Sequence, residues 1–94
     1  MMTKIGVTTK IQSDMLQEIA DERLKQEYKW GIQHLPGRLW FTILSEEVGE
    51  VAKELNEYKD YLDDPCFIKK IKEELIQVAA VAVAWLEDLE RNKH

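Results

Sequence analysis

The sequence predicts an all-α fold of three helices, a helical bundle that homo-oligomerisation completes. Apolar residues recur at helical spacing along long segments of the chain, and no segment reads as a strand. The 94 residues make one domain with a modest core. Because the chain has a single cysteine, an internal disulfide is excluded, and pairing with further copies remains as the way to reinforce that core.

The N-terminal residues differ in pattern from the rest of the chain. Residues 1–10 carry no helical period, so we expect an N-terminal arm that need not be ordered, followed by a helical domain over 11–94. A first helix is predicted over about 13–30. Asp14 would cap its start, with Gln17 as the capping-box partner.

A loop and a long second helix follow. Gly31 is placed to end the first helix, and Pro36 with Gly37 marks the loop over 31–37. The second helix is predicted from near Pro36 to about Tyr61. Its apolar residues form one stripe, made of Trp40, Leu44, Val48, Val51 and Leu55.

The third helix is predicted from Pro65 to about Arg91, with Asp64 as its N-cap. From Leu75 to Leu86 it is apolar on every side except at Gln77. A helix that is apolar all round must be buried all round, and two other helices of a short chain do not suffice. We therefore expect packing against a second subunit, in a dimer or a tetramer, rather than a monomer with an exposed apolar patch.

Composition limits the partners and the location. The net charge of −5 argues against binding to a nucleic-acid backbone and is compatible with a site for divalent cations. The longest apolar run is too short to span a bilayer, and no signal peptide is recognisable. A lone thiol fits a reducing compartment, so we expect a soluble, cytoplasmic protein.

Carboxylates form a ridge along one flank of the second helix. Glu46, Glu47 and Glu50 lie beside the apolar stripe, and Glu47, at its edge, should be partly buried. Like charges one turn apart repel, and Mg²⁺ would relieve the repulsion because it prefers carboxylate oxygens. Gly49 within this helix indicates close approach of another helix or a ligand, or else a tolerated surface glycine.

A second polar element lies on the third helix, where Glu74 and Gln77 share one side. Because Gln77 interrupts an apolar stretch, its amide should be hydrogen-bonded or coordinating. If the two long helices are antiparallel neighbours, the two clusters would face each other. The simpler interpretation of any Glu-rich helix is a solvated face.

These residues resemble the signature of the MazG-like, all-α nucleotide pyrophosphohydrolases. That signature is Glu-Glu-x-x-Glu followed after a spacer by Glu-x-x-Asp. The first half is matched within 43–52 (ILSEEVGEVA) and the second by 74–77 (ELIQ), with 51–73 as the spacer. The upstream segment 29–34 (KWGIQH) also resembles the stretch that often precedes the first motif.

The resemblance implies paired helical subunits in which acidic residues of adjacent helices bind Mg²⁺. The metal holds a nucleoside triphosphate, and water attacks between its α and β phosphates. The implied metal ligands are Glu46, Glu47, Glu50, Glu74 and Gln77, and one of Glu46 and Glu47 orients or deprotonates the water. Lys29 and Arg38 would meet phosphate charge, and Trp30 would contact the base or else serve as a core aromatic.

Gln77 departs from the family pattern, which has Asp at this position. A neutral amide is a weaker Mg²⁺ ligand than a carboxylate. The main expectation is therefore an enzyme that cleaves NTP or dNTP to monophosphate and pyrophosphate, serving nucleotide-pool housecleaning. The alternatives are a non-catalytic relative that binds nucleotide or metal, and a helical interaction module kept soluble by its acidic ridge. His34 reads as a loop hydrogen-bonder rather than a catalyst.

Overall fold

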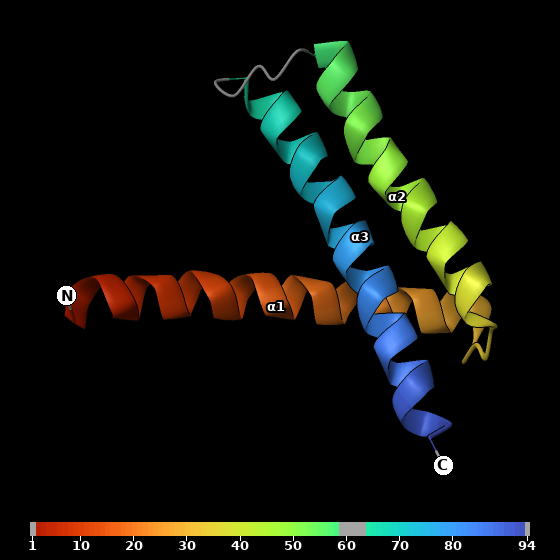
Figure 1. Cartoon of the computed structure of the whole chain (residues 1–94). Helices are drawn as coiled ribbons and strands as arrows, with labels where there is room; N and C mark the ends of the chain where they lie inside the picture. The colour runs from red at the N-terminus through yellow and green to blue at the C-terminus, as the bar shows by residue number, and fades with distance from the viewer. Residues whose placement is uncertain (1, 59–63, 94) are drawn as a thin grey trace.

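Three helices make up the chain in the computed structural model, which describes residues 2–58 and 64–93, with side chains over 9–57 and 64–93. They are α1 (Met2–Trp30), α2 (Gly37–Tyr58) and α3 (Pro65–Arg91), and the described residues include no strand. Figure 1 shows α2 and α3 side by side and antiparallel, with α1 crossing α3 and projecting beyond it. Within the described residues α3 packs on both other helices, whereas α1 and α2 do not pack on each other. The all-α prediction is confirmed.

The start of α1 differs from the prediction. The helix begins at Met2, so residues 2–10 continue it instead of forming a separate arm without helical structure. Extending an existing helix by a residue needs no new nucleus, so a helix can run on through residues that lack an apolar pattern. Figure 1 shows this part of α1 leading away from the other two helices.

The predicted cap at Asp14 is also wrong, because Asp14 lies inside α1. Its carboxylate accepts a hydrogen bond from Lys10 Nζ one turn earlier, at 3.2 Å. Gln17, the expected capping-box partner, instead donates from Nε2 to Asp21 Oδ1 at 2.9 Å. Both side chains therefore make ordinary contacts one turn apart on an exposed helix surface.

The other helix ends follow the predicted local signals. Gly31 has a φ of 73°, which favours glycine, and its N–H donates to Glu27 O at 2.8 Å. Asp64 caps α3 by accepting from Cys66 N at 2.9 Å, and Pro65 is the first helical residue. The described part of α2 ends at Tyr58, and the predicted end near Tyr61 lies outside the described residues.

The hydrophobic core is small and lies between α2 and α3. Its buried members are Trp40, Val81 and Ala84, against which further apolar side chains pack, namely Leu35, Ile43, Leu44 and Trp85. Trp40 and Leu44 of the predicted stripe thus face α3, but Val48 and Leu55 remain exposed in the single chain. In the single chain α3 therefore covers only part of the stripe.

A buried carboxylate joins the start of α2 to the end of α3. Asp88, only 2% exposed, accepts from Trp40 Nε1 at 2.7 Å, Leu35 N at 3.1 Å and His34 Nδ1 at 2.7 Å. The Trp40 hydrogen bond is the main cause that holds the pKa of Asp88 well below its usual range, against the opposing effect of burial. His34 is therefore a loop hydrogen-bonder, as predicted, and the contact sets the register of α2 on α3.

The single chain is more open than a compact monomer of its size. It exposes 7442 Å², whereas a folded monomer of 11.0 kDa exposes about 5,600 Å². Its radius of gyration is 15.6 Å, against about 12 Å for a compact domain of this length. Large apolar side chains account for part of the excess, among them Leu24, Leu75, Leu86 and Leu89. No helix among the described residues combines the length and the apolar character needed to cross a bilayer.

Candidate functional site

Carboxylates on all three helices influence Glu47 through their charge. Its side chain is half-buried, as the sequence predicted from its place at the edge of the stripe. Burial raises the pKa of Glu47 above 4.5, and the charges of Glu74, Glu50, Glu46 and Glu22 raise it further, in that order. These neighbours come from α3, from α2 and from α1. The structure therefore brings Glu46, Glu47, Glu50 and Glu74 together electrostatically, and it adds Glu22, which the sequence analysis did not assign to the site.

Glu74 is largely enclosed, with its side chain 14% exposed. Lys70, one turn earlier on α3, places Nζ at 3.4 Å from Glu74 Oε1. The hydrogen bond with Glu74 is the main cause that raises the pKa of Lys70, followed by the charges of Glu74, Glu54 and Glu73. Lys70 thus meets carboxylates from both α2 and α3.

Glu54 extends the carboxylate cluster toward the end of α2. It is 8% exposed, and its Oε2 is buried without a hydrogen-bond partner. An unsatisfied buried polar group costs about 1–3 kcal/mol, and more if charged. Glu54 lies two turns after Glu47, so the two side chains share one flank of α2. That spacing was visible in the sequence, but the burial of Glu54 was not predicted from it.

Gln77 lies between this cluster and α1. Its Oε1 accepts from Gln26 Nε2 at 3.4 Å, so the amide is hydrogen-bonded, which is one of the two outcomes predicted for it. Gln26 itself is buried. Nearby, Arg23 Nε donates to Glu87, which adds an ion pair between α1 and α3. The amide pair and the ion pair fix where α1 crosses α3, and with it the position of Glu22.

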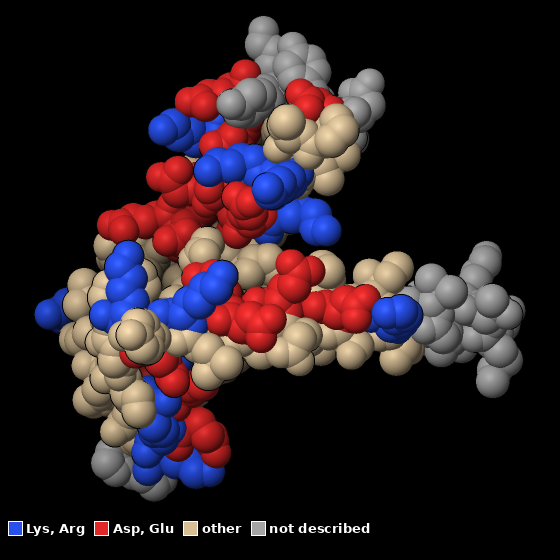
Figure 2. All heavy atoms as spheres, turned by 180° about the vertical axis from the view of Figure 1, so that it is seen from behind, with Lys and Arg blue, Asp and Glu red and all other residues tan. Residues whose placement is uncertain are grey.

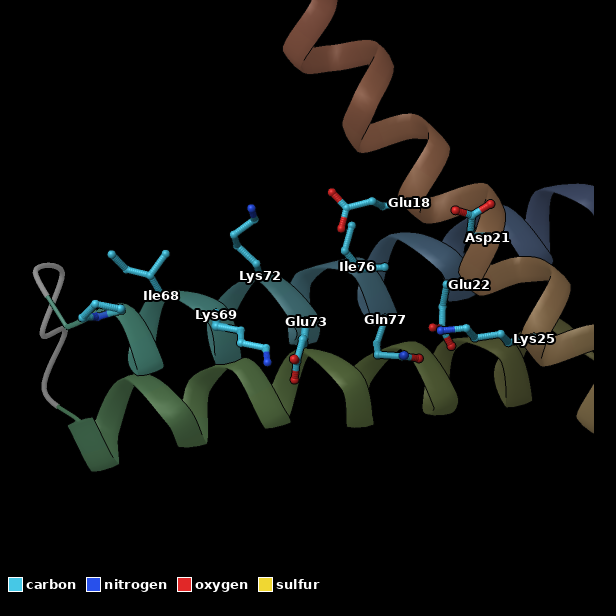
Figure 3. Close-up of a pocket in the computed structure, with 11 residues that line it drawn as sticks. Glu18, Asp21, Glu22, Lys25, Ile68, Lys69, Lys72, Glu73, Ile76 and Gln77 are labelled. Carbon is cyan, nitrogen blue, oxygen red and sulfur yellow. The ribbon is translucent and has the colours of Figure 1, made fainter.

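A cleft of about 670 Å³ opens between α1 and the first half of α3. Its apolar part comes from Pro65, Ile68 and Ile76, and Glu22 and Gln77 also line it. Figure 3 shows its charged side chains coming from both helices, and they are Glu18, Asp21, Glu22, Lys25, Lys69, Lys72 and Glu73. In Figure 2 acidic side chains face each other across the angle between α1 and the α2–α3 pair, with lysines among them.

The predicted substrate-binding residues lie at the other end of the helices. Lys29 and Trp30 end α1, with Lys29 Nζ 4.7 Å from the centroid of the Trp30 ring. Trp30 is exposed, so it is not a core aromatic of the single chain. Arg38 is exposed at the start of α2. The helical rise separates it from Glu47 by about 13 Å along the axis of α2. The structure does not place these three with the carboxylates, and their role in substrate binding stays a prediction.

The donor set fits a hard divalent cation in its chemistry. The side chains around Glu47 are carboxylates, which are ligands that Mg²⁺ prefers. Repulsion disfavours the ionised form of Glu47, and Glu54 has an oxygen without a hydrogen-bond partner among the described residues. Within residues 2–58 and 64–93, however, no three His, Cys, Asp or Glu side chains lie close enough together to form a ready-made metal site. A Cβ on Gly49 would meet nothing within 4 Å, so neither α1 nor α3, as far as they are described, approaches closely there.

Comparison of the chain with known protein families, with curated proteins and with solved structures finds no match. The resemblance to the MazG-like enzymes therefore depends on the motif residues and their spacing.

Proposed function

We propose that the protein is a Mg²⁺-dependent nucleotide pyrophosphohydrolase, which cleaves an NTP or dNTP to the monophosphate and pyrophosphate. One observation carries the proposal. Glu47 is half-buried among four other carboxylates from three helices, and this raises its pKa. Such a cluster is unfavourable when ionised, and a divalent cation removes the repulsion while presenting charge to a phosphate.

Within this proposal Glu50 and Glu74 hold the cation together with one of Glu46 and Glu47. The other of that pair orients the attacking water and accepts its proton. The raised pKa of Glu47 suits it to proton transfer, since a base works best when its pKa approaches the working pH. The oxygen of the water bonds to the α-phosphorus, the bond from that phosphorus to the α–β bridging oxygen breaks, and pyrophosphate leaves. When bound, Mg²⁺ supplies positive charge that polarises the phosphoryl oxygens.

The proposal includes a second copy of the chain. The surface in excess of a compact monomer is about 1,800 Å², more than the roughly 800 Å² that each partner buries in a standard interface. Leu75 and Leu86, on the helix expected to be buried all round, are exposed in the single chain. A mass above 11.0 kDa in multi-angle light scattering is expected, and a monomeric mass would refute this part.

A second candidate is a nucleotide- or metal-binding protein without turnover. Gln77 favours it, because the residue is a neutral amide where the family motif has a carboxylate, and its oxygen already accepts from Gln26. Loss of one charged ligand weakens a Mg²⁺ site. Binding without pyrophosphate release would distinguish this candidate from the enzyme.

The test is pyrophosphate release from a panel of ribo- and deoxyribonucleoside triphosphates, with and without Mg²⁺. Glu50→Gln is expected to abolish release. Glu57→Gln, an exposed position on the same helix, is the matched control and should retain it. No release from any substrate, with a Mg²⁺-induced rise in melting temperature, would favour the binding protein. If neither pyrophosphate release nor a rise in melting temperature is observed, a helical interaction module is the remaining interpretation.

A further inference from the structure

Lys70 is the cation that the structure places among the enclosed carboxylates. Its ammonium lies 3.4 Å from Glu74 Oε1, and Lys70 lines a cavity of about 220 Å³ together with Glu54. Glu54 has an oxygen that no donor among the described side chains reaches, although the residue is more than nine-tenths buried. Lys70 therefore pairs with Glu74 of its own helix and lies on the same cavity as Glu54 of α2.

We propose that Lys70 is a tethered counter-cation, which pairs with Glu74 in the metal-free protein and must leave it when a divalent cation binds. The inference rests on the proposed function, because it takes the carboxylate cluster as the cation site. It assigns Lys70 a role that the motif does not contain, since the residue lies within the spacer between the two motif halves. Lys70 thus competes with the metal and sets its affinity.

The geometry allows Lys70 to be displaced without a change of fold. The side chain is 48% exposed, so its flexible stem can move the ammonium into solvent by rotation about its own bonds. The order along the helix, with the lysine four residues before the glutamate, is also the weaker of the two orders for such a pair. The ion pair is therefore strong enough to offset repulsion and weak enough to yield to a doubly charged cation.

The released ammonium has a second consequence for the same site. With Glu74 engaged by a metal, Lys70 would lie one turn away on α3 with a free charge that could meet a phosphate. Phosphate oxygens are natural acceptors for lysine. The same side chain thus opposes metal binding in the empty protein and favours anion binding in the loaded one.

The experiment titrates MgCl₂ into the full-length, EDTA-treated protein by calorimetry, comparing Lys70→Met with wild type. Methionine keeps most of the stem and removes the charge. Because exposed ion pairs are worth a few tenths to one kcal/mol, the dissociation constant for Mg²⁺ is expected to fall about two- to fivefold. Lys72→Met is the matched control, because Lys72 has no ion pair within the described residues and points away from Gln77 in Figure 3. Lys72→Met removes the same charge, and the Mg²⁺ affinity of this variant should remain that of wild type.

Thermal melting gives a second readout that needs no turnover. Without Mg²⁺, Lys70→Met is expected to melt below wild type, and saturating Mg²⁺ should close the gap, whereas Lys70→Arg should behave as wild type in both conditions. Wild-type Mg²⁺ affinity in Lys70→Met, or an equal gain in Lys72→Met, would overturn the competition and leave the proposed function standing. If neither wild type nor Lys70→Met binds Mg²⁺, both the competition by Lys70 and the proposed function are overturned.

Discussion

Replacing Glu47 with glutamine is expected to stabilise the metal-free protein, although the residue belongs to the proposed catalytic site. The substitution keeps the shape of the side chain and removes a charge that four carboxylates oppose, those of Glu74, Glu50, Glu46 and Glu22. Glu50 lies one turn from Glu47, where a like-charge pair costs roughly 0.2–0.5 kcal/mol, and the charges of the other three carboxylates add to this. Because Glu47 is only half-buried, solvent screens these terms, and we expect a gain of about 1 kcal/mol in the free energy of unfolding.

The dependence on pH has a definite sign. The pKa of Glu47 in the folded chain lies above the ordinary value of 4.5, so the folded chain holds a proton that the unfolded chain has released. The free energy of unfolding therefore falls as pH rises through this range, and the penalty is complete above the folded pKa. Glu47→Gln should consequently stabilise the protein at pH 8 and have little effect at pH 4.

The assay is thermal unfolding in EDTA at a fixed protein concentration, since melting of an oligomer depends on concentration. About 1 kcal/mol corresponds to a rise in Tm of about 4–8 °C for a chain of this length. Glu57→Gln, on the exposed face of the same helix, is the control and should leave Tm unchanged. Saturating Mg²⁺ should stabilise wild type more than Glu47→Gln. A Tm for Glu47→Gln at or below that of wild type at pH 8 would refute the reasoning.

Three further perturbations test the rest of the structure. Asp88→Asn should lower Tm at pH 7, because the amide cannot accept from Trp40, Leu35 and His34 as a carboxylate does. In wild type the stabilisation from Asp88 is complete above about pH 4, the pKa of an unfolded Asp, and is lost as pH falls below it. Measuring Tm of wild type and of Asp88→Asn across acid pH checks this. Gln77→Asp should raise pyrophosphate release if the amide limits the site, and unchanged turnover in a steady-state assay would contradict that explanation. Leu86→Glu, at a side chain 64% exposed in the single chain, should lower the mass in light scattering toward 11.0 kDa, and an unchanged oligomer would place the interface elsewhere.

The parts of the fold that the sequence predicted well depend on local chemistry. Asp64 and Pro65 start α3 because a side-chain acceptor and a missing N–H satisfy the first turn, whatever the rest of the chain does. Gly31 ends α1 through a backbone conformation that glycine favours. The start of α1 was not predictable in this way, because helix extension through residues 2–10 has no cap or apolar pattern to mark it.

The candidate site was predictable along each helix but not between helices. The wheel of α2 placed Glu47 at the edge of the apolar stripe, and the structure has it half-buried. It did not indicate that Glu22 would approach from α1, because that depends on where α1 crosses α3. Asp88 was likewise indistinguishable from a solvated acid near a helix end. Its partners Trp40 and His34 lie about fifty positions earlier in the chain.

The buried Asp88 contact and the carboxylate cluster belong to one α2–α3 seam. In an antiparallel pair, about four turns forward from Trp40 along α2 and about four turns back from Asp88 along α3 lead to Glu54 and Glu74. The Trp40–Asp88 hydrogen bond therefore sets the register that brings two enclosed carboxylates to the same level of the seam, with Lys70 beside them. The Asp88 contacts at one end of the seam thus hold Glu54 and Glu74 at the other end, where the proposed cation would bind.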